Sequence, residues 1–233
     1  MMIFLVVGAA SAAAPAIPLY HATYSVSRND LHIGTTVFSL TKNQNGSYTY
    51  QSVTEPAGLV SLFRSDVITE TSHFNIVDCS PRPLLYSYTH IGGDHNQPHS
   101  IRFDWNKKLA YNSSGDKRST LPLKPDTYDR LLAQLLISLD AAQGATTNTL
   151  RVLDRGEFQT YRLLSVGTVG VKTPAGGYQT IEVARKDEKK NRTNTFWLAP
   201  KLDYLPVQMQ QTEPGKATIS LVLTEIKFDI PSR

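Results

Sequence analysis

The sequence is poor in cysteine: Cys79 is the only one among 233 residues. A single thiol cannot form an internal disulfide, so the fold must be stabilised by its packed core. Cys79 lies in Asp78-Cys79-Ser80-Pro81, a turn-like sequence, and this setting favours an incidental thiol over a reactive one. It is also far from the N-terminal apolar segment, whose end would need a cysteine if the protein were an acylated lipoprotein.

Long apolar runs are lacking as well. Residues 1–14 (MMIFLVVGAASAAA) have a short apolar core that is too short to cross a bilayer of about 30 Å. Small residues follow, and Ala10-Ser11-Ala12 and Ala12-Ala13-Ala14 both fit the signal-peptidase pattern, although no Lys or Arg precedes the core. We predict a cleavable signal peptide at 1–14, export to the periplasm and no transmembrane span in the mature chain. A buried N-terminal strand is the alternative.

A strong excess of one charge sign is also missing, since the formal net charge is only +4. The chain has 24 basic and 20 acidic residues, and apolar residues make up 40%, which is the composition of a globular protein. The densest charged run, Arg185–Arg192, contains its own acids, so we interpret it as a solvated turn between strands. No base-stacking motif or recognition helix accompanies it, and no nucleic-acid partner is expected.

Alternation of apolar and polar residues dominates the remainder and is typical of half-buried strands. Proline and glycine turns separate the strands, and no linker divides the chain. We therefore predict a mostly β fold in a single domain at 15–233, with an antiparallel, strongly curved sheet or (half-)barrel. The predicted strands are 20–27, 35–41, 47–53, 66–77, 84–90, 100–104, 108–112, 149–153, 158–169, 177–186, 194–198, 205–212 and 218–228.

The pattern changes once, at 125–142, where apolar residues recur at helical spacing. Pro125 or Asp126 is the expected start, with Asp126 as the N-cap, and Gly144 is the expected end. The leucines of this amphipathic helix should pack on or in the curved sheet. Burial of four leucines and Ile137 would contribute on the order of 10 kcal/mol.

The C-terminal third resembles a known family. The segments Phe196–Pro200 and Tyr204–Val207, followed by Gln208–Gln211, are similar to bacterial secreted proteins catalogued as domain of unknown function 3108. Shorter pieces that also fit are Thr173–Gly176, Asp129-Arg130 at the opening of the helix, Arg82-Pro83 with Tyr86, and Leu221–Leu223. The resemblance spans roughly residues 20–228. It implies export and a sheet curled around a helix, as in periplasmic lipoprotein carriers, and it brings no catalytic residue.

An apolar groove is the first candidate binding site. Leu59, Leu62 and Phe63 form an apolar loop, and Leu132 and Leu136 lie on the predicted helix. If helix and sheet leave a space, these residues could line a groove for an acyl chain or a hydrophobic peptide. If helix and sheet close on each other, the same residues form a packed core. The residue pattern leaves both alternatives open.

Two other clusters carry possible chemistry. His90, Asp94, His95 and His99 fall within ten residues and could bind zinc or copper, but a glycine-rich hairpin loop is the simpler interpretation. Glu55, Asp66 and Glu70 are close enough in sequence to suggest a carboxylate pair for glycoside hydrolysis. No nucleophile elbow, P-loop or dinucleotide fingerprint is present, and no cofactor is indicated.

The sequence thus favours a non-catalytic envelope protein that binds or carries a lipid or other hydrophobic ligand in the periplasm. An enzyme acting on envelope glycans and an assembly factor that binds another envelope protein are the alternatives.

Overall fold

The computed structural model describes residues 17–58, 61, 65–92, 98–187 and 191–229. The predicted signal peptide at 1–14 lies outside these residues, as do Leu59, Leu62, Phe63, Asp94 and His95.

The described chain forms one sheet of fifteen strands in the order β8-β7-β6-β5-β4-β3-β2-β1-β15-β14-β13-β12-β11-β10-β9. Neighbouring strands are antiparallel, except for the two-residue parallel contact of β9 with β10. The strands are β1 (Tyr20–Arg28), β2 (Leu31–Lys42), β3 (Tyr48–Pro56), β4 (Val67–Val77), β5 (Ser80–Ile91), β6 (His99–Asp104), β7 (Leu109–Ser114), β8 (Lys117–Pro122), β9 (Thr127–Tyr128), β10 (Thr147–Asp154), β11 (Glu157–Thr173), β12 (Gly176–Asp187), β13 (Arg192–Ala199), β14 (Leu205–Thr212) and β15 (Ile219–Phe228). A short 3-10 helix, η2 (Pro200–Leu202), joins β13 to β14.

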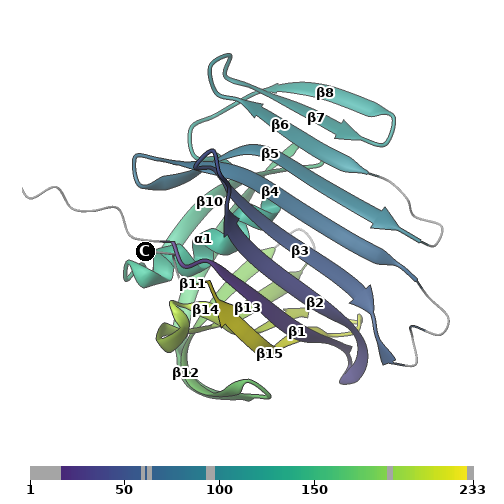
Figure 1. Ribbon diagram of the computed structural model, residues 1–233, viewed down its shortest axis with the longest axis vertical. Coiled ribbons are helices and arrows are strands. Elements are labelled where there is room, and N and C mark those ends of the chain that lie inside the picture. The colour runs from purple at the N-terminus through teal and green to yellow at the C-terminus, as the bar shows by residue number, and fades with distance from the viewer. Residues whose placement is uncertain (1–16, 59–60, 62–64, 93–97, 188–190, 230–233) are drawn as a thin grey trace, which may run out of the picture.

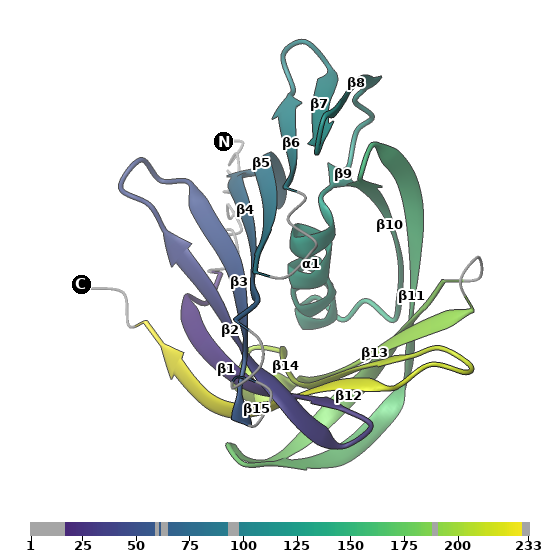
Figure 2. The same ribbon diagram turned by 90° about the vertical axis from the view of Figure 1, so that its right-hand side faces the viewer.

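The sheet curls until its two halves face each other across the helix α1 (Arg130–Ala142), as Figures 1 and 2 show. β1 and β15 pair in the middle of the sheet, so the beginning and the end of the folded chain lie side by side. The edge strands β8 and β9 do not pair with each other, and the sheet remains open. The predicted mostly β, strongly curved architecture is confirmed, with the helix inside the curl.

Helix α1 is buried on most of its surface, because sheet surrounds it. Its buried side chains include Leu131, Leu132, Leu135, Leu136 and Ile137. The helix ends as predicted, with Gly144 at a φ of +80° just after the last turn. Among the described residues no helix is long and apolar enough to cross a membrane.

The predicted start of this helix was wrong. It begins at Arg130, and Asp129 is its N-cap, whereas Asp126 lies in a turn at a φ of +53°. The residues between them, Thr127 and Tyr128, form strand β9 instead and pair with β10 at Arg151 and Val152. Tertiary pairing therefore replaced the first helical turn that Pro125 and Asp126 favoured.

Several strands also differ from the sequence prediction: β2 begins earlier, at Leu31, and β11 ends later, at Thr173. β8 was missed because most of its residues are exposed at the sheet edge, so no apolar alternation marks it. β5 begins at Ser80, before Pro81 and Pro83, rather than at Leu84. The prolines fit because β6 pairs with β5 only from Leu85 onward, which leaves the first residues of β5 with a single neighbouring strand.

Aromatic side chains fill the core beside the helix. The ring of Phe38 lies 5.5 Å from that of Tyr24 and 5.9 Å from that of Tyr50. The buried hydroxyl of Tyr24 donates a hydrogen bond to the carbonyl oxygen of Pro206 at 2.7 Å. This bond links β1 to β14 over the intervening strand β15, and burial raises the pKa of Tyr24 well above its ordinary value.

Candidate functional site

A polar cavity of about 690 Å³ lies between the first turn of helix α1 and the inner face of the sheet. Four arginines line it: Arg130, Arg155, Arg185 and Arg192. Four acidic residues line it as well: Glu70, Asp154, Glu157 and Asp187. Amide and hydroxyl side chains make up most of the remaining wall, and Phe38 and Leu131 are its apolar side chains. The curl of the sheet thus encloses a largely charged chamber beside the apolar core.

Arg130 and Glu70 form the central ion pair of this wall. Arg130 donates from Nε to Oε2 of Glu70 at 2.7 Å and from Nη2 to Oε1, a bidentate arrangement. The hydroxyl of Tyr86 donates to the same Oε2 at 2.8 Å, and the Arg130 guanidinium lies 5.3 Å from the ring centre of Tyr88. Burial opposes the charged form of Arg130, but the charge and hydrogen bonds of Glu70 raise the pKa of Arg130 overall.

Asp129 holds the start of the helix in place. Its Oδ1 accepts hydrogen bonds from the backbone N–H groups of Leu131 at 3.0 Å and Leu132 at 2.8 Å. Its Oδ2 accepts one from the hydroxyl of Ser72 at 2.6 Å. Burial raises the pKa of Asp129 to about 6 despite these three hydrogen bonds. The cap fixes the position of the neighbouring Arg130 at the cavity wall.

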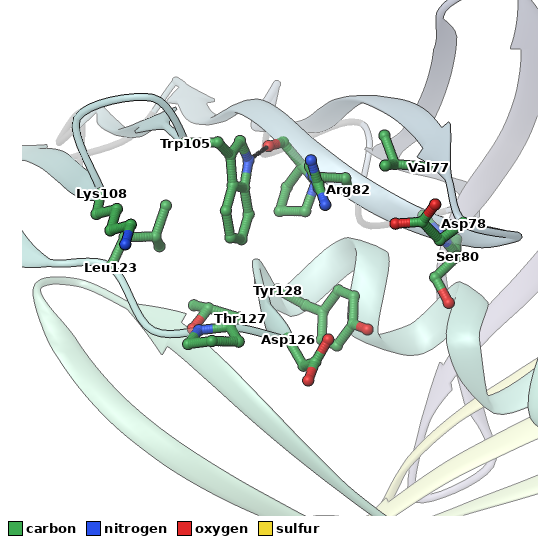
Figure 3. Close-up of a pocket in the computed structure, with 13 residues that line it drawn as sticks. Val77, Asp78, Ser80, Arg82, Trp105, Lys108, Leu123, Asp126, Thr127 and Tyr128 are labelled. Carbon is green, nitrogen blue, oxygen red and sulfur yellow. Dashed lines mark hydrogen bonds between the residues drawn. The ribbon is translucent and has the colours of Figure 1, made fainter.

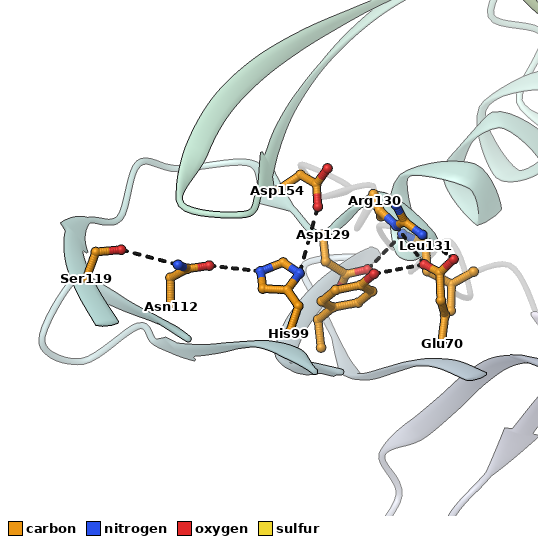
Figure 4. A network of polar contacts seen from close by, with 9 residues as sticks. Glu70, His99, Asn112, Ser119, Asp129, Arg130, Leu131 and Asp154 are labelled. Carbon is orange, nitrogen blue, oxygen red and sulfur yellow. Dashed lines mark hydrogen bonds and ion pairs between the residues drawn. The ribbon is translucent and has the colours of Figure 1, made fainter. Parts of the chain in front are cut away.

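A chain of polar contacts leads from the cavity toward the sheet edge (Figure 4). His99 Nδ1 lies 3.9 Å from Oδ1 of Asp154, and His99 Nε2 lies 2.8 Å from Oδ1 of Asn112. Asn112 then donates to the hydroxyl of Ser119 at 3.3 Å. Burial lowers the pKa of His99, so the imidazole is neutral at pH 7. The amide of Asn112 separates the hydroxyl of Ser119 from the imidazole of His99. His99 is therefore not placed to act as the base for a Ser119 nucleophile.

Three buried polar atoms of the cavity wall have no hydrogen-bond partner among the described residues. They are Nε of Arg185, Nδ2 of Asn194 and Oδ1 of Asp154. The Arg185 guanidinium lies 3.9 Å from the ring centre of Tyr161, which holds it against β11. Burial raises the pKa of Tyr161, and the charge of Arg185 acts in the opposite direction. The cavity wall therefore contains two donors and one acceptor that make no hydrogen bond within the described residues, which suits polar recognition.

A second, smaller cavity of about 420 Å³ lies between the β4–β5 turn and the segment before helix α1 (Figure 3). Trp105 forms part of its wall, and its indole N–H donates to the carbonyl oxygen of Pro83 at 2.7 Å. The guanidinium of Arg82 covers the same ring at 5.3 Å. None of the unpartnered buried side-chain atoms in the described part of the chain belongs to this cavity. The smaller cavity therefore offers a polar ligand fewer free hydrogen-bonding groups than the larger one.

Comparison with known proteins identifies the family. A family model described as "Protein of unknown function (DUF3108)" matches residues 20–222. The chain belongs to this family. Among solved structures it is similar to a beta-barrel-like protein of the domain of unknown function DUF1849 from Brucella abortus, with 12% identity and a TM-score of 0.58. That match covers 94% of this chain and 100% of the other, and at this identity it shows the fold alone. No curated protein matches the sequence.

The candidate groove residues of this DUF3108 chain are only partly described. Leu59, Leu62 and Phe63 lie outside the described residues. Leu132 and Leu136 are buried in the core, with 0% and 5% exposure, and they line neither of the two cavities above. The apolar groove itself stays a prediction.

The candidate metal-binding residues are also only partly described. Asp94 and His95 lie outside the described residues, whereas His90 Nε2 faces Oδ1 of Asp66 at 3.5 Å. His99 is buried in the separate contact with Asn112. Within the described ranges, no three His, Cys, Asp or Glu side chains gather as a metal site would require.

Sequence reasoning missed the residues that make the cavity polar. Arg185 and Arg192 were grouped into a solvated turn, yet both line the cavity from the ends of β12 and β13. One signal was available, because the period-two pattern of Val183 continues to Arg185 and places both on the inner face. Nothing in the local sequence indicated that Arg130, from the helix, would meet the same chamber.

Proposed function

We propose that this protein is an exported, non-catalytic binding protein of the cell envelope that holds a small polar ligand in the cavity beside helix α1. The observation that carries the proposal is the set of buried, unpartnered polar atoms on Arg185, Asn194 and Asp154. A buried polar group without a partner costs about 1–3 kcal/mol. A ligand in the cavity that supplies matching acceptors and a donor would satisfy these atoms and recover that cost.

The chemistry of the cavity favours a polar ligand over the hydrophobic ligand expected from the sequence. An acyl chain would take solvent away from the charged side chains of the lining without offering them hydrogen bonds in return. The volume of about 690 Å³ is in the range of small-molecule sites. The apolar side chains of helix α1 face the core, where Leu132 and its neighbours are already packed.

Export to the periplasm is part of the same proposal. It is supported by the N-terminal segment at 1–14, with its short apolar core and small residues before a cleavage site. A binding protein in this compartment would act on ligands between the membranes, either as a carrier or as a sensor that presents a ligand-bound surface to another envelope protein.

An enzyme acting on envelope glycans is the second candidate, because carboxylates do line a polar cavity. Glycoside hydrolysis needs one carboxyl group that donates a proton and a second that acts as a base or nucleophile. Glu70 is unsuited to either role, because Arg130 donates hydrogen bonds to both of its carboxylate oxygens and Tyr86 donates another to Oε2. Incubation with cell-envelope glycans and measurement of released reducing ends would reveal hydrolysis, and that result would overturn the non-catalytic proposal.

Native mass spectrometry of the protein purified from its own periplasm tests the binding function. We expect a bound mass of a few hundred daltons, released by denaturation, which would also identify the ligand. Gln211→Trp places an indole in the cavity and should abolish the adduct. Gln210→Trp is the matched control, because the neighbouring residue of β14 points to the opposite face of the sheet. Bare polypeptide in the wild type, or an adduct that survives Gln211→Trp, would contradict the proposal.

A further inference from the structure

Arg185 and Asn194 occupy directly paired positions on neighbouring strands. Their Cα atoms are partners in the antiparallel register of β12 and β13, and both side chains line the polar cavity. Side chains at such positions have Cβ atoms about 4.5–5.5 Å apart. Each contributes one buried N–H donor without a partner among the described residues, Nε of Arg185 and Nδ2 of Asn194. Two such donors on adjacent strands can reach the same acceptor group.

The Arg185 guanidinium is held in a defined plane. It lies 3.9 Å from the ring centre of Tyr161, whose strand β11 pairs with β12 on the other side. A guanidinium presents its N–H groups as a planar fork that matches the oxygens of a carboxylate or phosphate. Stacking on Tyr161 orients this fork before any ligand arrives, so the ordering cost of binding is reduced.

The charges around the cavity limit how acidic the ligand can be. The four lining arginines are matched by four lining acids, and Arg192 additionally contacts Glu213 at 3.2 Å. Such a balanced wall has no net positive charge with which to attract a polyanion. Oδ1 of Asp154 has no hydrogen bond and only the 3.9 Å contact with His99, so it calls for a donor on the ligand, such as a hydroxyl or an amine.

We propose that Arg185 and Asn194 form an oxyanion-binding site and that the ligand carries one carboxylate or phosphate group together with a hydrogen-bond donor. This inference rests on the proposed function, because it names the ligand class of the same cavity. Charge-assisted hydrogen bonds from Arg185 should make the acidic ligand bind about 10- to 100-fold more tightly than a neutral analogue of the same shape.

Nuclear magnetic resonance on the nitrogen-15-labelled full chain tests the site at its own atoms. The Arg Nε–H and Asn Nδ2–H₂ signals are assigned by their absence from spectra of Arg185→Gln and Asn194→Leu. Titrations with acetate, inorganic phosphate, chloride and neutral erythritol are compared at constant ionic strength. We expect saturable shifts of both signals with acetate or phosphate, and the stronger of the two identifies the ligand's acidic group. Absence of these shifts, or equal shifts with chloride, would overturn the inference.

Variants separate this inference from the proposed function. Arg185→Gln and Asn194→Leu should each weaken binding of the effective anion about tenfold or more. Arg162→Gln is the matched control: it removes the same charge from an exposed position next to Tyr161 and should bind like the wild type. Should Arg185→Gln fail to fold, Asn194→Leu leaves the stacked guanidinium in place and still tests the site. A native adduct that persists in both variants would overturn the oxyanion site alone, whereas a wild type without any adduct would overturn the proposed function.

Discussion

Arg130 and Glu70, sixty positions apart in the chain, form a bidentate ion pair that joins the first turn of helix α1 to strand β4. Their side chains are 30% and 17% exposed, so the pair is only partly screened by solvent. This contact holds the helix at the polar end of the interior. It also places a balanced pair of charges between the apolar core and the cavity.

Breaking this pair should destabilise the protein. Arg130→Met leaves the Glu70 carboxylate with the hydrogen bond from Tyr86 but without its cation, and we expect a loss of about 2–3 kcal/mol in the free energy of unfolding. Adding Glu70→Gln should recover part of that loss, because the uncompensated charge disappears. Urea unfolding of the wild type, both single variants and the double variant measures the coupling. Strictly additive effects would show that the two residues do not depend on each other.

Removal of the Tyr24 hydroxyl should weaken the contact between β1 and β14. Tyr24→Phe leaves the buried ring in place but removes the hydrogen bond to Pro206, at a cost of about 1–2 kcal/mol. Tyr48→Phe removes a hydroxyl from a ring stacked on Phe74 and serves as the control, for which we expect a change within about 0.5 kcal/mol. Chemical unfolding compares the two, and equal effects would contradict a role for the Tyr24 bond.

Gly34 allows strands β2 and β3 to approach closely. A Cβ atom at this position would lie 2.6 Å from the carbonyl oxygen of Glu55, a backbone atom that cannot move aside without shifting its strand. We therefore expect Gly34→Ala to destabilise the protein by about 1–3 kcal/mol. Gly177→Ala is the control, because nothing lies within 4 Å of the added methyl group. Similar melting temperatures for the two variants would disprove the close approach.

The fold could be predicted from the sequence because its main signal is local. Alternation in segments such as Leu205–Thr212 marks an inner and an outer face, and that strand has the predicted bounds. The absence of further helical segments then requires an antiparallel sheet. Where non-local pairing decided the structure, the prediction failed: β9 exists because Thr127 and Tyr128 meet β10, which no local pattern reveals.

The candidate site was harder to predict because its residues come from distant strands. Arg185 and Asn194 become neighbours only through the β12–β13 register, and Tyr161 joins them from β11. In sequence, Arg185 is the first residue of a charged run that resembles any exposed turn. Only the curl of the sheet turns its side chain toward a shared interior, and the sequence contains no local measure of that curvature.

Asp129 should make the stability of the protein depend on pH. Burial raises the pKa of this carboxyl from 3.8 to about 6, so between these values the folded state binds a proton that the unfolded state releases. The contribution of Asp129 to stability is therefore fully present below about pH 4 and is lost as the pH rises through about 6. Asp129→Asn keeps an N-cap oxygen for Leu131 and Leu132 and an amide that can donate to Ser72, but it does not titrate.

The free energy of unfolding of Asp129→Asn, relative to the wild type, should thus increase between pH 4 and pH 7, by no more than about 3 kcal/mol. Urea unfolding at a series of pH values measures this difference directly. Asp126→Asn, which removes the same charge from an exposed turn three residues earlier, is the control for the loss of a charge. If the Asp129→Asn profile runs parallel to that of the wild type, the buried cap does not titrate in this range. A rising difference would instead show that the buried carboxyl of Asp129 becomes charged at neutral pH at a cost in stability that the asparagine does not carry.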